Sequence, residues 1–225
     1  MAFLPLIIWL LLVSGASQTV RSFYPHLSDW KQVFADHVIF ALASIFSIAM
    51  VLAIAGKTFA RRLKGFGLNI RTLPADLWAA LVNLLSIYPV IWAVVVLTMF
   101  AGQLIRPDFQ MQPHKELETL IAHSQLSLRT LIFVTTILLI PICEEVIFRG
   151  LLQTVIRSYV KRPWLSIALA SVIFTAAHYD PTHWPALFVL SMCIGYSYEK
   201  SGSILRPICI HALFNAVSII GSLYQ

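Results

Sequence analysis

Apolar residues gather in long runs along this chain, and short gaps between the runs hold most of the charged residues. Because a helix that crosses a membrane needs about 20 mostly apolar residues, we expect each run to form one membrane helix. The approximate ranges of the seven runs are 2–20, 38–56, 77–105, 128–148, 163–179, 184–199 and 204–223. The predicted fold class is therefore all-α, a polytopic transmembrane helical bundle.

The first run, 2–20, resembles a signal peptide in one respect, because "SGAS" offers small residues at a plausible cleavage point. It lacks a basic residue before its apolar core, so we expect a retained helix. The fourth run continues past two glutamates through "VIFRGLLQTVIRSYV", with apolar residues at helical spacing, until "KRP". Pro163 then suits the first turn of the next helix.

Composition agrees with a membrane protein: 59% of the residues are hydrophobic and 12% are charged, and the mean hydropathy is +0.81. The net charge of +6 raises the possibility of nucleic-acid binding, which requires basic residues concentrated on a folded surface. Here the basic residues are spread over short gaps, so we interpret them as topology signals and expect no nucleic-acid partner.

Lys and Arg are enriched in cytoplasmic loops of membrane proteins. With seven spans, the loops on one side hold ten of them: Lys57, Arg61, Arg62, Lys64, Arg71, Arg157, Lys161, Arg162, Lys200 and Arg206. The loops on the other side hold five: Arg21, Lys31, Arg106, Lys115 and Arg129. This asymmetry predicts a cytoplasmic amino terminus and an outer carboxyl terminus.

Two adjacent carboxylates, Glu144 and Glu145, stand at the end of the fourth apolar run. A charge near the bilayer centre costs at least about 2.5–3.5 kcal/mol, so such residues indicate a functional site. On a helix Glu145 and Arg149 are four residues apart and can pair, whereas Glu144 points about 100° away. The alternative is a structural ion-pair cluster or a helix cap.

The remaining eight carboxylates lie in loops or at segment ends and need no special explanation. They are Asp29, Asp36, Asp76, Asp108, Glu116, Glu118, Asp180 and Glu199. The three cysteines, Cys143, Cys193 and Cys209, show no paired metal-ligand spacing. We expect them to be small core residues in a reduced setting.

Three further polar residues fall within the later apolar runs. Lys161, in the expected turn, is midway between Glu144 and His178, so an antiparallel helical hairpin brings those two residues to the same height. His211 and Asn215 are four residues apart and share a helix face. We expect a site in the cytoplasmic half of the membrane. The alternatives are a packing histidine at 178 and a helix–helix hydrogen bond from the other pair.

These side chains suit attack by an activated water on a carbonyl. Glu144 would act as general base and later as acid, His178 would orient the water, and His211 and Asn215 would donate to the oxyanion. In a second arrangement, Glu144, His178 and His211 would hold a zinc ion with its fourth position left to water. Both arrangements need the same residues, and the sequence does not decide between them.

Other hydrolytic chemistries fit less well. There is no HExxH pair for a helical zinc protease, and Ser17 and Ser197 lie near segment ends with no base placed beside them. Asp180 and His183 in "HYDPTH" could form a metal pair, but a short loop with a turn at Asp180–Pro181 explains them as well. We expect the loop.

Together these residues resemble the CPBP family, the intramembrane proteases related to type II CAAX prenyl endopeptidases and to abortive-infection proteins. The family pattern is EExxxR, then FxxxH, then HxxxN or HxxxD. This chain has Glu144-Glu145-x-x-x-Arg149, Phe174-x-x-x-His178 and His211-x-x-x-Asn215, in that order. The resemblance divides one integral membrane domain into N-terminal transmembrane helices, 1–127, and a CPBP-like catalytic helical core, 128–223.

The resemblance implies an endopeptidase in the membrane, with Glu144 as catalytic base and His178, His211 and Asn215 as its partners. Glu145 and Arg149 would position Glu144. Such enzymes have been described both as zinc metalloproteases and as glutamate-dependent proteases without metal, so the cofactor stays open. The implied partners are the lipid bilayer and a membrane-associated peptide or protein, since only some relatives process prenylated CAAX proteins.

We expect a multi-pass protein in the cell membrane of a prokaryote, with its site facing the cytoplasm. A first rival hypothesis is a non-catalytic membrane scaffold or immunity protein of the same fold. A second is a transporter or proton relay, which would favour ionisable residues across the full membrane thickness. In this sequence they gather at one expected depth.

Overall fold

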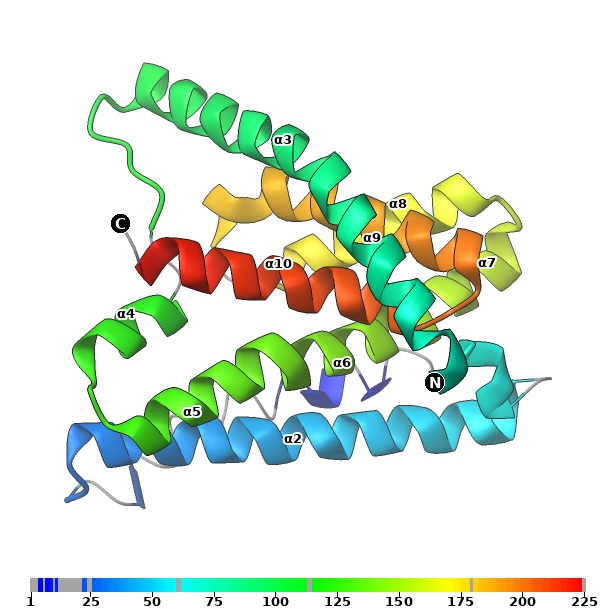
Figure 1. Ribbon diagram of the computed structural model, residues 1–225, viewed down its shortest axis with the longest axis horizontal. Coiled ribbons are helices and arrows are strands. Elements are labelled where there is room, and N and C mark those ends of the chain that lie inside the picture. Colours follow the sequence, from blue (N-terminus) through cyan, green and yellow to red (C-terminus); the bar gives the residue numbers. More distant parts are fainter. Residues whose placement is uncertain are drawn as a thin grey trace.

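The computed structural model describes residues 4–5, 7–9, 11, 22–23, 26–59, 62–112, 115–178 and 180–223. All regular structure in these ranges is helical, with no strand, which confirms the predicted all-α class. Figure 1 shows α2, the α5–α6 helix and α10 alongside one another, with α3 crossing them at an angle.

The helices are bounded as follows. The α-helices are α2 (Asp29–Thr58), α3 (Leu73–Ile105), α4 (Lys115–Ala122), α5 (Leu126–Val134), α6 (Ile140–Glu145), α7 (Thr154–Val160), α8 (Pro163–Ala176), α9 (Trp184–Ser201) and α10 (Leu205–Leu223). Two π-helical segments are η3 (Thr135–Leu139) and η4 (Val146–Gln153). Three 3-10 helices are η1 (Arg62–Phe66), η2 (Ile70–Thr72) and η5 (Pro181–His183).

Three helices of the described part are long and apolar enough to cross a membrane: Asp29–Thr58, Lys64–Ile105 and Leu126–Val160. The apolar helices Pro163–Ala176 and Leu205–Gly221 are shorter. With 14 residues, α8 is only about 21 Å long at 1.5 Å per residue, less than the roughly 30 Å of bilayer hydrocarbon. The helices thus fit an integral membrane protein. The number of seven spans stays a prediction, and range 2–20 falls largely outside the described residues.

The long helix predicted around the glutamates is present as one continuous run from residue 126 to 160. It ends at Lys161, whose φ of 57° is left-handed, and Pro163 opens α8 in its first turn. α8 packs back against α7 and η4. The predicted turn and antiparallel hairpin are therefore confirmed.

The main core cluster surrounds the second half of this long helix. Phe148 and Phe174 meet edge to face with ring centroids 5.0 Å apart, and both side chains are buried. Gly150 faces Phe66, and a Cβ at Gly150 would lie 2.2 Å from that ring. The cysteines are free as expected, and Cys143 is buried in this cluster.

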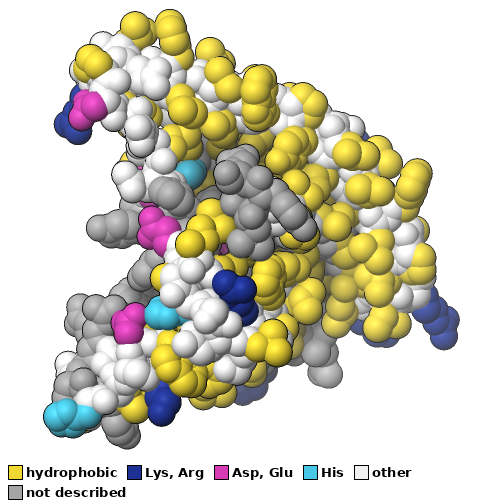
Figure 2. Space-filling view, turned by 60° about the vertical axis from the view of Figure 1, so that its left-hand side comes forward, with side chains coloured by type: hydrophobic (Ala, Val, Ile, Leu, Met, Phe, Trp, Pro, Cys, Tyr) yellow, Lys and Arg dark blue, Asp and Glu magenta, His cyan; other side chains and the backbone are white. Residues whose placement is uncertain are grey.

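Much of the outer surface is apolar. Figure 2 shows hydrophobic side chains spread over a large part of the visible face, with sparse charged ones. Among the large exposed hydrophobic residues are Trp92, Leu97 and Phe100 on α3, with exposed fractions of 65%, 63% and 61%. A water-soluble fold rarely presents so continuous an apolar surface, whereas the hydrocarbon of a bilayer covers it without cost.

A buried carboxylate, Asp76, ties the start of α3 to the start of α10. It is 1% exposed and accepts hydrogen bonds from Thr72 Oγ1 at 2.8 Å, Ser203 Oγ at 2.8 Å and Arg206 Nε at 3.0 Å. The sequence correctly placed Asp76 at a segment end but gave no sign of its burial. Its partners in α10 and the preceding turn fix the helix that carries His211.

We expect Asp76→Ala to lower the free energy of unfolding by about 1–3 kcal/mol, because it leaves two hydroxyl groups and a guanidinium without their acceptor. Thermal unfolding of the purified protein in detergent measures the loss. Asp108→Ala, at an exposed position, is the control and should leave the midpoint unchanged. Equal midpoints for the two variants would show that the Asp76 contacts add nothing to stability.

Candidate active site

The charged residues of the first motif lie inside the helical bundle. Glu144 and Glu145 are the last residues of α6, and Arg149 follows in the π-helical segment η4. Their exposed fractions are 6%, 0% and 1%. Since lipid cannot replace lost water around a charge, the surrounding helices must provide the polar partners.

Glu145 and Arg149 form the ion pair that their spacing predicts. Arg149 Nη1 donates to Glu145 Oε1 at 3.3 Å, and Arg149 Nε lies 3.2 Å from Oε2. The guanidinium carbon lies 4.8 Å from the centre of the Phe174 ring, a distance at which a cation is attracted to the ring face. The spacing of four residues along one helix therefore buries both charges of the Glu145–Arg149 ion pair together.

His211, reaching in from α10, contacts both glutamates. Its Nδ1 is 2.8 Å from Glu145 Oε1, and its Nε2 is 3.8 Å from Glu144 Oε2. Glu145 as a carboxylate can only accept hydrogen bonds, so Nδ1–H of His211 is the donor and the other nitrogen faces Glu144. The sequence predicted that these residues meet, but not that His211 bonds Glu145.

Glu144 has fewer partners than Glu145. Oε1 of Glu145 accepts two hydrogen bonds, and its Oε2, which accepts none, lies 3.2 Å from Arg149 Nε. Oε2 of Glu144 is buried and accepts no hydrogen bond from the residues that the structure describes, and 3.8 Å is too long for one from His211. As expected from the rotation of about 100° between neighbouring helical residues, Glu144 does not share the hydrogen-bond partners of Glu145. Glu144 is close to the ionic cluster yet keeps a free carboxylate oxygen.

His178 joins this group through Phe174. The Nδ1 of His178 lies 2.8 Å from the carbonyl oxygen of Phe174, so Nδ1–H donates and Nε2 carries the free lone pair. The Phe174 ring centroid is 4.7 Å from that of His178 and 6.0 Å from that of His211. Phe174 entered the sequence analysis only as a motif residue; in the fold its ring contacts both imidazoles.

Asn215 reaches the same long helix at Thr136, and a proline explains why. In the π-helical segment η3, Ile140 N–H bonds the carbonyl of Thr135, five residues earlier. The corresponding partner for the Thr136 carbonyl would be Pro141, which has no N–H. Asn215 Nδ2 fills this vacancy by donating to Thr136 O at 2.9 Å. One amide proton of Asn215 is thus committed to the backbone, and one remains available.

The zinc arrangement would need Glu144, His178 and His211 to converge on one ion. In both His178 and His211, Nδ1 donates to an oxygen and leaves Nε2 as the nitrogen able to bind a metal, as is usual for metal ligands. Within the described ranges, however, no three His, Cys, Asp or Glu side chains are gathered to hold a metal ion. Glu144, His178 and His211 as placed here do not fit a three-ligand zinc site, so no step is derived through a metal.

Among the described residues, the other polar candidates have structural partners. His183 Nε2 lies 3.5 Å from Asp180 Oδ2, but no third His, Cys, Asp or Glu joins this pair in the described ranges. Ser197 is buried and its hydroxyl accepts from Asn83 Nδ2 at 3.3 Å, while Ser17 lies outside the described residues. Asp180 Oδ1 accepts from the backbone N–H of Thr182 at 2.9 Å and caps η5, which confirms the loop interpretation.

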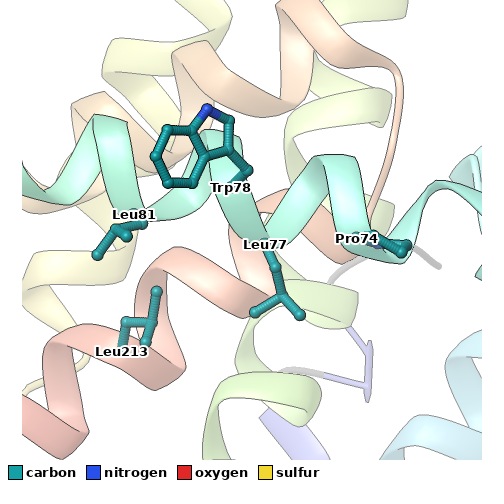
Figure 3. Close-up of a pocket in the computed structure, with 5 residues that line it drawn as sticks. All are labelled: Pro74, Leu77, Trp78, Leu81 and Leu213. Atoms are coloured by element: carbon teal, nitrogen blue, oxygen red, sulfur yellow. The ribbon is translucent and has the colours of Figure 1, made fainter.

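An apolar crevice of about 340 Å³ lies between α3 and α10. Figure 3 shows four of its lining residues on α3 and one on α10: Pro74, Leu77, Trp78, Leu81 and Leu213. It includes none of the predicted site residues. With no carboxylate or imidazole in its lining, this crevice offers contact to hydrocarbon and no means to activate water.

We expect Asn215→Ala to reduce the free energy of unfolding by about 1 kcal/mol by leaving the Thr136 carbonyl unpaired. In a Pro141→Ala background the same change should cost clearly less, because a new backbone N–H can serve that carbonyl. The double-mutant cycle is measured by unfolding in detergent. Additive effects would mean that Pro141 is not the reason for the Asn215 contact.

The region that carries the candidate site is similar to a known protein family, and the chain is similar to two bacterial proteins. Residues 126–217 match the model of a family described as type II CAAX prenyl endopeptidase Rce1-like. An Escherichia coli protein named "Uncharacterized 24.3 kDa protein" is 32% identical over 85 residues, which cover 36% of this chain and 39% of the relative. "Uncharacterized protein YpbD" of Bacillus subtilis (strain 168) is 35% identical over 98 residues, which cover 42% and 46%.

The chain spans less than half the length of either of these curated relatives. No solved structure matches significantly. The matched segment contains all six predicted site residues: Glu144, Glu145, Arg149, His178, His211 and Asn215. The resemblance indicated by the three motifs is thereby confirmed: residues 126–217 match the family described as type II CAAX prenyl endopeptidase Rce1-like.

Proposed function

We propose that this protein is an intramembrane endopeptidase that hydrolyses peptide bonds of membrane-associated proteins or peptides, with Glu144 activating the attacking water. One observation carries the proposal. Glu144 has a buried carboxylate oxygen that accepts no hydrogen bond from the described residues, next to an imidazole and to Glu145, which is ion-paired with Arg149. A carboxylate oxygen without a hydrogen-bond donor is available for a reactant, and residues 126–217 match the model of a protease family.

In the proposed reaction, Glu144 removes a proton from water while the water oxygen attacks the scissile carbonyl carbon. The carbonyl oxygen becomes an oxyanion, and the second N–H of Asn215 Nδ2 can donate a hydrogen bond to it. His211 can add a second donor at Nε2 when its ring carries both protons. Glu144 then gives its proton to the leaving amine nitrogen, the C–N bond breaks, and the carboxylate is restored.

The other site residues hold these groups in place. Glu145 orients His211 through Nδ1, and Arg149 neutralises Glu145. The free Nε2 of His178 can accept a hydrogen bond from the water and orient it. An ordered environment of this kind lowers the barrier because the dipoles need no rearrangement during the reaction.

For the substrate we propose a membrane-associated peptide or protein of the CAAX-protease type, bound from the lipid. The apolar exterior and the enclosed polar site agree with entry of a substrate segment from the bilayer. The excess of Lys and Arg in alternate loops favours a site facing the cytoplasm in a prokaryotic cell membrane.

We expect Glu144→Gln to reduce proteolysis by at least about a hundredfold, because the amide cannot take up the proton of water. The measurement compares peptide termini in membranes of cells that express wild type or variant at matched protein level. Glu118→Gln, a change at an exposed position on α4, should retain wild-type termini. Termini that are identical in all three samples, with a preserved cellular phenotype, would favour a non-catalytic scaffold.

A second measurement separates the two hydrolytic arrangements. We expect purified enzyme dialysed against a zinc chelator to keep its activity, because no three-ligand group is assembled in the described part of the site. Elemental analysis of the same samples reports the zinc that remains. Activity that disappears with zinc and returns on adding it would establish the zinc arrangement instead.

A further inference from the structure

Three polar contacts connect the long helix to α9 at a constant offset. Arg149 contacts Ser191, Gln153 contacts Gly195 and Arg157 contacts Glu199, each pair separated by 42 residues. Both members advance by four residues from one contact to the next, so the two helices run in the same direction in fixed register. We call these three pairs the α9 ladder.

The first pair of the α9 ladder is at the candidate active site. Ser191 is completely buried, and Arg149 Nη2 donates to its Oγ at 2.8 Å and to its carbonyl oxygen at 3.2 Å. The other two guanidinium nitrogens face Glu145, and the Phe174 ring lies against the guanidinium. Every nitrogen of Arg149 therefore has an oxygen partner, and Ser191 is the partner from outside its own helix.

A continuous series of contacts leads from Ser191 to the catalytic glutamate. Ser191 holds Arg149, Arg149 holds Glu145, Glu145 accepts from His211 Nδ1 at 2.8 Å, and His211 Nε2 faces Glu144. The orientation of Glu145 decides which nitrogen of His211 carries the proton.

We propose that Ser191 is a positioning residue of this active site, acting through Arg149 and Glu145 to fix the tautomer and orientation of His211. The proposal rests on the proposed proteolytic function. It assigns a role to a residue outside the three motifs. A serine in a membrane helix often serves only close helix packing. The hydroxyl of Ser191, however, accepts a short hydrogen bond from the buried guanidinium of Arg149.

The kinetic test uses a fluorogenic peptide made from a cleavage sequence identified by the terminus comparison. Ser191→Ala should lower kcat about tenfold or more, the scale expected for one hydrogen bond to a charged group, with KM changed less than twofold. Ser191→Thr, which keeps a hydroxyl, should recover most of kcat.

Gln153→Ala is the matched control, because it removes the next contact of the α9 ladder, Gln153 Nε2 to Gly195 O at 3.1 Å, without touching Arg149. It should lower the unfolding midpoint about as much as Ser191→Ala while retaining kcat. Equal losses of kcat in both variants would overturn the proposal and leave Ser191 with a packing role.

A spectroscopic test is independent of proteolysis. Imidazole nitrogen resonances of ¹⁵N-histidine protein, assigned with a His211→Gln variant, report which His211 nitrogen is protonated. Ser191→Ala should shift the Nδ1 resonance of His211, and Gln153→Ala should not. If no activity depends on Glu144, the proposed function fails, yet this shift would still support the positioning role. Unchanged His211 resonances in Ser191→Ala would overturn it.

Discussion

A charged side chain inside a membrane protein is stable only where protein groups replace the water that it has lost. In this molecule that constraint applies to Arg149, which is 1% exposed and forms the centre of the polar core. Its partners come from three helices: Glu145 from α6, Phe174 from α8 and Ser191 from α9. The charge pair lies within one helix, whereas moving α8 or α9 would remove the Phe174 ring or the Ser191 acceptors from the buried guanidinium. The solvation of Arg149 and the helix arrangement therefore depend on each other.

The same long helix also departs from regular α geometry where the site requires it. Pro141 cannot donate to the carbonyl of Thr136, and two π-helical segments flank the short α6 that presents the glutamates. π-turns often occur at functional sites because they free backbone groups and rotate the following side chains. Here the freed carbonyl binds Asn215, so the irregularity attaches α10, and with it His211, to the helix of the glutamates.

Local patterns were enough to predict the long apolar helices from residue 38 onward and the nearest pairings, but not the short helix α4 (Lys115–Ala122). Apolar runs predicted the helices and the hairpin turn at Lys161, and spacing of four residues predicted the pairing of Glu145 with Arg149. Contacts between distant residues could not be predicted in this way. Ser191 is 42 residues from Arg149, and Asp76 is 130 residues from Arg206, so their pairing depends on helix register. From the sequence alone, a serine within an apolar run that accepts a hydrogen bond from arginine looks the same as one that only packs between helices.

The two adjacent glutamates show how one backbone step creates two chemical environments. A rotation of 100° per residue directs Glu145 toward Arg149 and His211, where its carboxylate is held by an ion pair and a hydrogen bond. The same rotation leaves Oε2 of Glu144 beside the outer nitrogen of His211 without a hydrogen bond. A base must be close to positive or polar groups and yet have an oxygen free for a proton. Neighbouring positions on one buried helix provide two different environments, because Glu145 Oε1 accepts from Arg149 and His211 Nδ1 while Oε2 of Glu144 accepts from neither.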